Sequence, residues 1–183
     1  SSTGEVKRLA RIVKPDISVI TTIAPEHLEF FKTMDNIFKT ETEVLSELKN
    51  GGLGVINGDN EYLKKLKTKK NIISFGFLSD NNLVIDFKED FSSFNFKNKK
   101  IKIRLKNHIK HNYLNAAAAF ISGYLLGVPE KKIIAALEKF DGVPLRMQII
   151  KRKNSVIILD AYNANPESMD NAIKEISKYK KFA

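Results

Sequence analysis

The sequence predicts an α/β fold in which a largely parallel sheet is interleaved with helices. Short apolar runs rich in β-branched residues, such as residues 16–22 and 53–57, alternate with longer stretches whose apolar residues recur at helical spacing. The short runs are apolar at consecutive positions, which is typical of strands buried on both faces of a parallel sheet. Strands that alternate with helices along a chain indicate the α/β class.

The first part of the chain is predicted to alternate between helices and strands. Pro15 ends the first helix because proline cannot continue the helical hydrogen bonding. Gly51 and Gly52 end a second helix, since glycine readily takes the left-handed conformation found just past a helix end. The elements expected here are a helix over residues 5–14, a strand over 16–22, a loop over 23–31, a helix over 34–50, a strand over 53–57 and a turn over 57–60.

The middle of the chain changes from buried runs to alternating patterns. Residues 83–87 and 101–106 alternate apolar and polar side chains, which is typical of strands with one buried face. The polar stretch 91–100 lies between them, so we expect a small antiparallel meander inserted into the α/β sheet. Before it, the sequence predicts a short basic helix over residues 61–70 and a strand over 71–77.

The last part of the chain is predicted to contain two helices and the start of a second domain. Residues 111–127 have the pattern of a helix with a narrow, alanine-rich face, and Pro129 opens the next helix. A break near Val143 divides the chain into domains of residues 1–143 and 144–183. The second domain is expected to contain strands over 147–153 and 155–160, a loop over 161–165 and a helix over 166–181.

The composition limits the function classes. The 183 residues are 43% hydrophobic and 28% charged, which is ordinary for a folded protein and excludes wholesale disorder. Lys and Arg (31) outnumber Asp and Glu (21), and the net charge of +10 makes nucleic acid, anionic lipid or a phosphorylated small molecule the first partners to consider. No stretch approaches the ~20 apolar residues of a membrane span. The absence of cysteine excludes a disulfide, a thiolate metal site and a cysteine nucleophile.

Polar residues follow three of the predicted strands, where ligand sites of α/β sheets lie: in the loop after residue 22, in the turn 57–60 and in the loop after Asp160. His27 lies in the first of these loops, and a neutral imidazole there could coordinate a metal or contact phosphate. The alternative is a loop histidine hydrogen-bonded to a carboxylate. Lys39 follows on the next helix and, taken alone, is equally consistent with a solvated cation.

His111 and Asn115 are four residues apart, so both side chains point the same way from the start of the alanine-rich helix. The Asn115 amide can donate and accept, which suits the edge of a purine. The alternative is a helix capped by Asn112, with Asn115 in solvent.

A second cluster of candidates surrounds the last predicted strand. Asp160 ends that strand, where an acid commonly binds a ribose hydroxyl or a cation; the alternative is an acceptor for a helix N-terminus. Arg146 precedes the first strand of this domain and is a candidate anion clamp. The helix starting at Pro166 offers free N–H groups to phosphate or carboxylate. The loop before it carries the remaining candidates, Tyr162, Asn163 and Asn165.

Two lysine-rich stretches, residues 64–70 and 97–106, would suit a nucleic-acid surface because phenylalanines lie close to the second. The alternative is solvated surface, since the basic residues of 101–106 form the polar face of an alternating strand. The chain contains no phosphate-binding loop of the GxxxxGK[ST] type, no GxGxxG and no HExxH motif.

Taken in order, several segments resemble the Mur ligase family. They are TGEVKRLARIVKPDISVITTIAPEHLE (3–29), FKTE (38–41), LGVINGDN (53–60), KHNYLNAAAAF (110–120), LRMQI (145–149) and LDAYNANPESM (159–169). The last segment is the most specific, and it is similar to the members that add D-alanyl-D-alanine to UDP-N-acetylmuramoyl-tripeptide. The chain then corresponds to the second part of a central, P-loop-ATPase-like domain followed by the start of a Rossmann-like C-terminal domain.

The resemblance implies a bacterial, cytoplasmic, ATP- and Mg²⁺-dependent amide ligase of peptidoglycan synthesis, acting as a monomer. ATP converts the carboxylate of the tripeptide to an acyl phosphate, which the dipeptide amine attacks. Transferred by position, the resemblance implies that His27 and a carbamylated Lys39 hold Mg²⁺. It implies that Asn115, with His111 beside it, contacts adenine and that Asp160 contacts ribose. It also implies that Arg146 clamps phosphate and that the phosphates or the incoming substrate are faced by Tyr162, Asn163 and Asn165.

The sequence departs from the family pattern at three positions, where Thr22, Thr40 and Ile109 replace an asparagine and two glycines. The larger departure is the missing phosphate-binding loop, so we expect an internal fragment that is inactive by itself, because that loop positions the transferred phosphoryl group. Two alternatives stay open: a sister ligase that adds a single amino acid, and a basic nucleic-acid-binding module.

Overall fold

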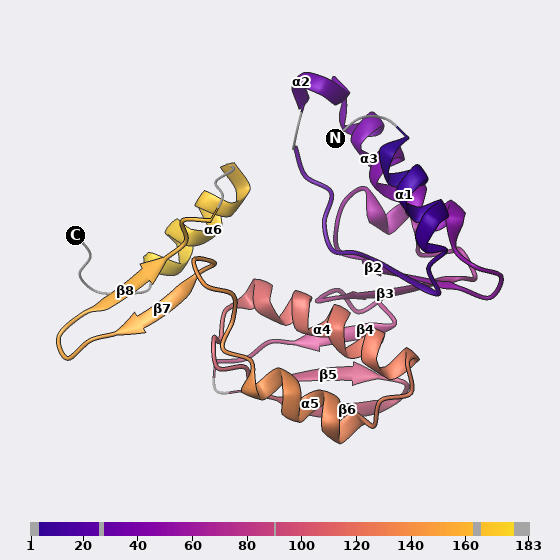
Figure 1. The fold of residues 1–183 in the computed structure, drawn as a ribbon. Coiled ribbons are helices and arrows are strands. Elements are labelled where there is room, and N and C mark those ends of the chain that lie inside the picture. Colours follow the sequence, from indigo (N-terminus) through magenta and orange to yellow (C-terminus); the bar gives the residue numbers. More distant parts are fainter. Residues whose placement is uncertain (1–3, 26–27, 90, 163–165, 178–183) are drawn as a thin grey trace.

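The structure is a computed structural model that describes residues 4–25, 28–89, 91–162 and 166–177. It confirms the predicted α/β class. A six-stranded sheet with helices against it is followed by a two-stranded hairpin and one further helix (Figure 1).

The strand order of the sheet follows the order of the sequence, β1-β2-β3-β4-β5-β6. β1 to β4 run parallel to one another, and β5 and β6 are antiparallel additions that continue the sheet beyond β4. β6 therefore runs parallel to β4, and the chain leaves β6 at the edge where β1 to β4 also end. The strands are β1 (Ile17–Ile20), β2 (Leu53–Asn57), β3 (Ile72–Gly76), β4 (Leu83–Asp86), β5 (Ser92–Phe96) and β6 (Lys99–Ile103).

Two apolar cores lie on opposite faces of the sheet. The first joins β2 to β6 to α4 and α5, and its centre includes Phe94 and Phe120. The second joins β1 to β3 to α3 and the neighbouring short helices through Ile37, Ile56 and Leu63. β2 and β3 contribute to both cores, whereas β4 to β6 contribute to the first core alone. The helices of this part are α1 (Glu5–Val13), α2 (Leu28–Phe31), α3 (Met34–Glu41), the 3-10 helices η1 (Thr42–Glu47) and η2 (Leu63–Leu66), α4 (Lys110–Leu125) and α5 (Glu130–Lys139).

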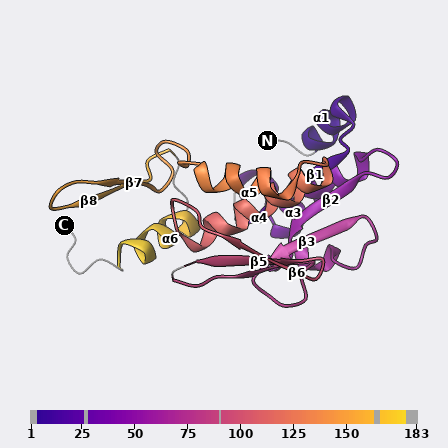
Figure 2. The same cartoon turned by 90° about the horizontal axis from the view of Figure 1, so that it is seen from below.

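The alanine-rich helix α4 packs closely on the sheet, as its sequence predicts. Ala116, Ala117 and Ala118 are buried, and small side chains there bring the helix axis near the strands. Phe120 lies edge-on to Phe94, with ring centroids 5.6 Å apart. Figure 2 shows α4 and α5 together along one side of the sheet.

The antiparallel part differs from the prediction in two respects. Residues 92–96, expected to be a polar connection, form strand β5, and its register sets Leu83 opposite Phe96. Ser92, Phe94 and Phe96 face α4, so the strand alternation was concealed by serine on the buried side. The meander is also not a separate insertion, because β4 pairs with β3 in the main sheet.

Three predictions about helices were wrong: one helix end, one helix type and one loop. The α-helix expected over 34–50 ends at Glu41 and tightens into η1; there the Thr42 hydroxyl donates to the Phe38 carbonyl at 2.6 Å, a local bond that competes with helix continuation. Residues 61–70 form only the 3-10 turn η2, because closely spaced lysines repel one another in a helix. The segment expected to be a loop over 23–31 contains α2.

The C-terminal unit contains a hairpin and a helix. β7 (Gln148–Lys151) and β8 (Val156–Leu159) pair antiparallel, and α6 (Pro166–Ile176) follows β8. The order of strand, strand and helix agrees with the prediction. Apolar side chains of this unit are exposed, among them Ile157 (42%) and Ile173 (62%).

One edge of the sheet also exposes apolar groups. Among the described residues β1 pairs only with β2, and Val19 on it is 44% exposed. α1 presents Leu9, Ile12 and Val13 to solvent as one stripe at helical spacing. Within the described part of the chain, no helix combines the length and apolarity needed to cross a membrane.

Candidate functional site

The carboxyl edge of the sheet gathers most of the predicted site residues. Strands β1 to β4 and β6 end there, and α4 begins there because it follows β6 after a short loop. Ligand sites of α/β sheets form at this edge. The topology therefore places the first turns of α4, which carry His111 and Asn115, beside the ends of the parallel strands.

The first turns of α4 present Asn115 to solvent and leave His111 half-buried. The helix begins after Ile109, whose side chain offers no cap. The expected cap at Asn112 is not formed, since the Asn112 amide instead donates to the Asn107 carbonyl at 3.2 Å. An exposed amide at the helix start can both donate to and accept from the edge of a planar ring.

Arg146, Asp160 and Tyr162 lie together, although 16 positions separate the first from the last. The guanidinium of Arg146 lies over the Tyr162 ring, 4.2 Å from its centroid. Asp160 Oδ1 accepts from the Met147 N–H at 3.2 Å. The cluster joins a cation held on an aromatic face to a carboxylate, and both groups can bind a phosphorylated sugar.

Lys39 is set apart from these clusters. It occupies the last turn of α3, its side chain is exposed, and its side-chain amine has no hydrogen-bond or ion-pair partner among the other described residues. Its backbone carbonyl accepts from the Thr42 hydroxyl at 3.3 Å. The desolvated surroundings that would favour a neutral, carbamylation-ready amine are therefore not supplied by the described residues. His27, Asn163 and Asn165 lie outside the described residues.

The described residues do not by themselves form a magnesium site. No three His, Asp or Glu side chains of the described segments are grouped as metal ligands. Mg²⁺ requires several oxygen ligands in octahedral geometry. Lys39 as a carbamate would supply at most part of that set.

The polar side chains of the turn 57–60 make hydrogen bonds within the chain that stabilise the fold. Asp59 accepts hydrogen bonds from the Phe77 N–H at 2.5 Å and from the Asn81 amide at 2.8 Å. A Cβ on Gly76 would lie 2.2 Å from Asp59 Oδ1, so only glycine permits this approach. Asn60 ties the loop after β1 to this turn by donating to the Ile23 carbonyl at 3.0 Å. These bonds explain the polar residue types without a ligand.

A histidine that the sequence did not single out fixes the approach to α4. His108 Nε2 lies 2.7 Å from the Lys88 carbonyl oxygen, which can only accept, and Nδ1 lies 2.7 Å from the Tyr113 hydroxyl. Tyr113 is fully buried, and its oxygen also accepts from the Leu105 N–H. Phe87 stacks on the imidazole, with centroids 4.9 Å apart. A lone histidine gives no local sequence signal for partners five and twenty positions away.

The basic stretch 97–106 is largely paired within the chain. Lys97 lies over the Tyr124 ring, Lys100 donates to Asp86 at 3.1 Å, Lys102 lies over Phe91 and Lys106 donates to Asp141. The bond from Lys100, with the nearby Lys88 charge, holds the pKa of Asp86 below its usual value. These contacts agree with the solvated-surface alternative better than with a nucleic-acid surface.

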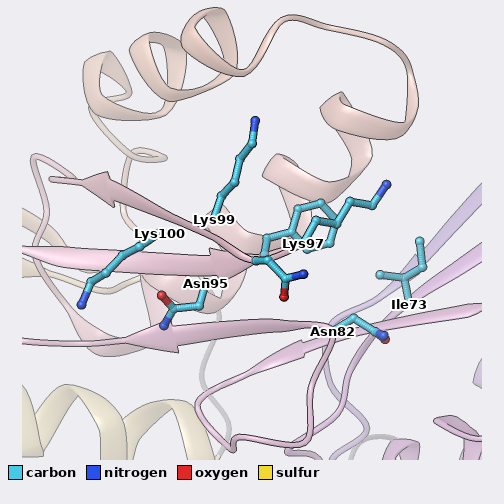
Figure 3. Close-up of a pocket in the computed structure, with 8 residues that line it drawn as sticks. Ile73, Asn82, Asn95, Lys97, Lys99 and Lys100 are labelled. Atoms are coloured by element: carbon cyan, nitrogen blue, oxygen red, sulfur yellow. The ribbon is translucent and has the colours of Figure 1, made fainter.

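An open pocket of about 590 Å³ lies at the β5–β6 hairpin. Figure 3 shows Lys99 and Lys100 pointing to opposite sides of the hairpin, as neighbouring residues of a strand must. The lysines therefore do not converge on a single anion. The pocket lies at the start of β4, which is the edge opposite the carboxyl ends. It is lined by Ile73, Asn82, Asn95, Phe96, Lys97, Asn98, Lys99 and Lys100.

Comparison with known proteins adds independent information. Residues 1–123 match the family described as the Mur ligase middle domain. The UDP-N-acetylmuramate–L-alanine ligase of Dictyoglomus turgidum is 28% identical over 175 residues, which are 90% of this chain and 38% of that protein. The UDP-N-acetylmuramoyl-tripeptide–D-alanyl-D-alanine ligase of Bacillus subtilis is 29% identical over 177 residues, 95% of this chain and 39% of that protein.

A solved structure extends the likeness to the C-terminal unit. The MurF ligase of Thermotoga maritima, in complex with ADP, superposes with a TM-score of 0.85 at 25% identity, covering 98% of this chain and 43% of that one. The chain thus spans about two fifths of the length of these relatives. The family match covers most of the chain, from the first helix through most of α4. The chain belongs to the Mur ligase family.

Proposed function

We propose that the full protein containing this chain is an ATP-dependent amide ligase that joins D-alanyl-D-alanine to UDP-N-acetylmuramoyl-tripeptide. The observation that carries the proposal is the segment LDAYNANPESM, which begins at the end of β8. The likeness to MurF over nearly the whole chain, hairpin and α6 included, supports it. The sequence of this chain holds no phosphate-binding loop, so we expect these 183 residues alone to be inactive.

The proposed reaction proceeds in two steps. An oxygen of the tripeptide's terminal carboxylate attacks the γ-phosphorus of ATP, which forms an acyl phosphate and releases ADP. The amine of D-alanyl-D-alanine then attacks the acyl carbon, loses a proton and expels inorganic phosphate. The intermediate activates a carboxylate that would otherwise be a poor electrophile.

The proposal assigns the nucleotide to the carboxyl edge. Asn115, with His111 on the same side of α4, would contact adenine, and the exposure of Asn115 supports this role. Asp160 would bind a ribose hydroxyl, since within the described segments Met147 engages one of its two oxygens. Arg146, held over Tyr162, would neutralise phosphate charge. Asn163 and Asn165 complete the proposed phosphate and substrate contacts.

Mg²⁺ is proposed from the family, with His27 and a carbamylated Lys39 as ligands. We expect Lys39→Ala in the full protein to lower turnover strongly and to regain part of it with a short carboxylate, which restores an anionic oxygen. Lys64→Ala, at another exposed lysine, serves as the control. Unchanged turnover in Lys39→Ala would remove this lysine from the mechanism.

A second candidate is the ligase that adds L-alanine to UDP-N-acetylmuramate. It is favoured by curated relatives such as the Dictyoglomus turgidum enzyme. The two candidates share the ATP chemistry and differ in both the acceptor carboxylate and the attacking amine.

Phosphate release by the purified full-length protein distinguishes them. We expect release only when ATP, the UDP-linked tripeptide and D-alanyl-D-alanine are all present. Release with UDP-N-acetylmuramate and L-alanine, and not with the tripeptide pair, would assign the second candidate. Activity with neither pair would contradict the ligase proposal as a whole.

A further inference from the structure

The turn that carries Arg146 has an unusual backbone. Leu145 and Met147, on either side of Arg146, both adopt left-handed conformations, with φ of 61° and 46°. L-residues with a Cβ disfavour this region because the Cβ approaches the following carbonyl. Such conformations persist where the surroundings impose them, and they gather at functional sites. Hydrogen bonds to two other parts of the chain hold this turn in its conformation.

Some of the hydrogen bonds that fix this turn come from the C-terminal unit. The Leu145 carbonyl accepts from the N–H groups of Ala161 and Tyr162, at 3.0 and 3.2 Å, and the Met147 N–H donates to Asp160 Oδ1. These bonds fix the turn to the segment that supplies Asp160 and Tyr162. Arg146, Asp160 and Tyr162 consequently move as one group.

A further hydrogen bond to this turn comes from the loop between β6 and α4, which belongs to the sheet body. Asn107 Nδ2 donates to the Met147 carbonyl at 2.9 Å, across 40 residues of sequence. The Asn107 carbonyl accepts from the Asn112 amide on the first turn of α4. Asn107 thus connects the helix that bears Asn115 to the turn that bears Arg146.

Asn107 makes these contacts at an energetic cost. Its Oδ1 is buried and has no hydrogen-bond partner among the described residues. A buried acceptor without a donor lowers stability, and so does each left-handed residue of the turn. The unpaired oxygen and the left-handed residues both lower stability at this junction. Their presence indicates that the junction positions Arg146 and does not mainly stabilise the fold.

We propose that Asn107 is a positioning residue: by holding the Met147 carbonyl, it sets the Arg146 guanidinium relative to the adenine contact on α4. The inference rests on the proposed function, because it requires that both α4 and Arg146 bind one nucleotide. A hydrogen bond lost at this point would displace Arg146 without removing it. The adenine contact itself would remain in place.

A double-mutant cycle on the full-length protein tests the proposal. Asn107→Leu removes the amide at similar volume, and we expect it to lower kcat about tenfold with a smaller change in KM for ATP, the effect of losing one well-placed hydrogen bond. Arg146→Ala should lower kcat at least as much. In the Arg146→Ala background, Asn107→Leu should have no further effect, because the residue acts through Arg146. Asn95→Leu, the same change on β5, is the matched control.

Each outcome separates the inference from the proposed function. If Arg146→Ala lowers kcat but Asn107→Leu does not, the inference is wrong and the function stands. If the two effects multiply in the double variant, Asn107 acts independently and the inference also fails. If the wild-type protein hydrolyses no ATP with any substrate pair, the proposed function fails first.

A second measurement covers the case in which Asn107→Leu does not fold. Asn107→Ser, which is too short to reach the Met147 carbonyl, should leave the melting temperature within a few degrees of wild type and accelerate amide hydrogen exchange at Met147, Ala161 and Tyr162. Unchanged exchange at these amides together with unchanged kcat would overturn the proposal.

Discussion

The sheet body, residues 5–140, and the C-terminal unit are held in different ways. The body buries a dense set of apolar side chains in two cores, from Ile20 to Ile133. Beyond residue 140, Met147 is the one buried apolar side chain among those the structure describes. Three groups hold the unit at the same point: the Asp160 carboxylate and the Leu145 carbonyl, which accept hydrogen bonds, and the Asn107 amide, which donates one.

The difference shows how one chain can combine a rigid platform with an adjustable part. Apolar burial gives large, non-directional stabilisation that resists displacement. Hydrogen bonds give directional but individually small stabilisation. Ligand contacts on α4 would therefore be fixed by packing, whereas those on the C-terminal unit would depend on a few polar bonds.

The largest expected effect is Phe120→Ala in the body. Phe120 is fully buried and packs against Phe94 and Phe96, so its loss should lower the free energy of unfolding by about 3–5 kcal/mol. Ile157→Ala, on the half-exposed hairpin, should cost about 1 kcal/mol or less because little packing is removed. Urea unfolding followed by circular dichroism measures both. Equal losses would refute the contrast between the two regions.

Met147→Ala is expected to have an intermediate and local effect. The side chain is 6% exposed, and its truncation should cost about 2 kcal/mol, the low end for a buried methionine. Amide exchange should rise in β7, β8 and α6 and stay unchanged in β2 and β3. Exchange that rises equally in the body would mean that the two regions unfold as one unit.

A smaller effect, of opposite sign, is expected at Lys14. This exposed residue follows α1 with φ of 47°, so Lys14→Gly should relieve strain and raise stability by about 0.5–1 kcal/mol. Arg8→Gly, inside the same helix, should instead cost about 1 kcal/mol. Thermal unfolding reports both changes. A loss of stability in Lys14→Gly would show that its conformation is held as firmly as the turn around Arg146.

The smallest expected effect concerns acid stability. The hydrogen bond from Lys100 and the charge of Lys88 lower the pKa of Asp86 below its ordinary value of 3.8. A carboxylate with a lowered folded pKa stabilises the protein above its ordinary value, and this stability is lost as the pH falls through the folded pKa. In Asp86→Asn, the unfolding midpoint should fall less steeply with decreasing pH below pH 3.8. Above pH 3.8 the slope of the midpoint against pH should be little changed. An unaltered acid slope would show that the pair contributes nothing measurable.

Sequence periodicity predicted the sheet body well, because burial controls both pattern and structure there. The runs that became β1, β2 and β3 and the stripe of α4 were found within a few residues. β5 was missed since Ser92 and Ser93 are buried, and serine carries no apolar signal. The end of α3 was missed because it depends on the Thr42 hydroxyl, which donates to a helix carbonyl. The spacing of apolar residues does not record such a polar contact.

The candidate site could be predicted only in part. Arg146, Asp160 and Tyr162 were each singled out and lie together, but nothing local indicated that Asp160 would accept from Met147. Asn107 was not singled out, because its partner is 40 positions away and no local pattern records such a bond. Polar contacts between distant segments depend on the completed fold, so a linear pattern does not contain them.

The unpaired side of β1 has a practical consequence for handling the isolated chain. No other described strand pairs with this side, so its N–H and C=O groups, with Val19 beside them, form a template on which another strand can pair. On α1, the exposed stripe of Leu9, Ile12 and Val13 adds apolar surface that promotes association. The 183-residue polypeptide should therefore self-associate on concentration, despite a net charge of +10 that opposes it. Light scattering against protein concentration would reveal this colloidal behaviour.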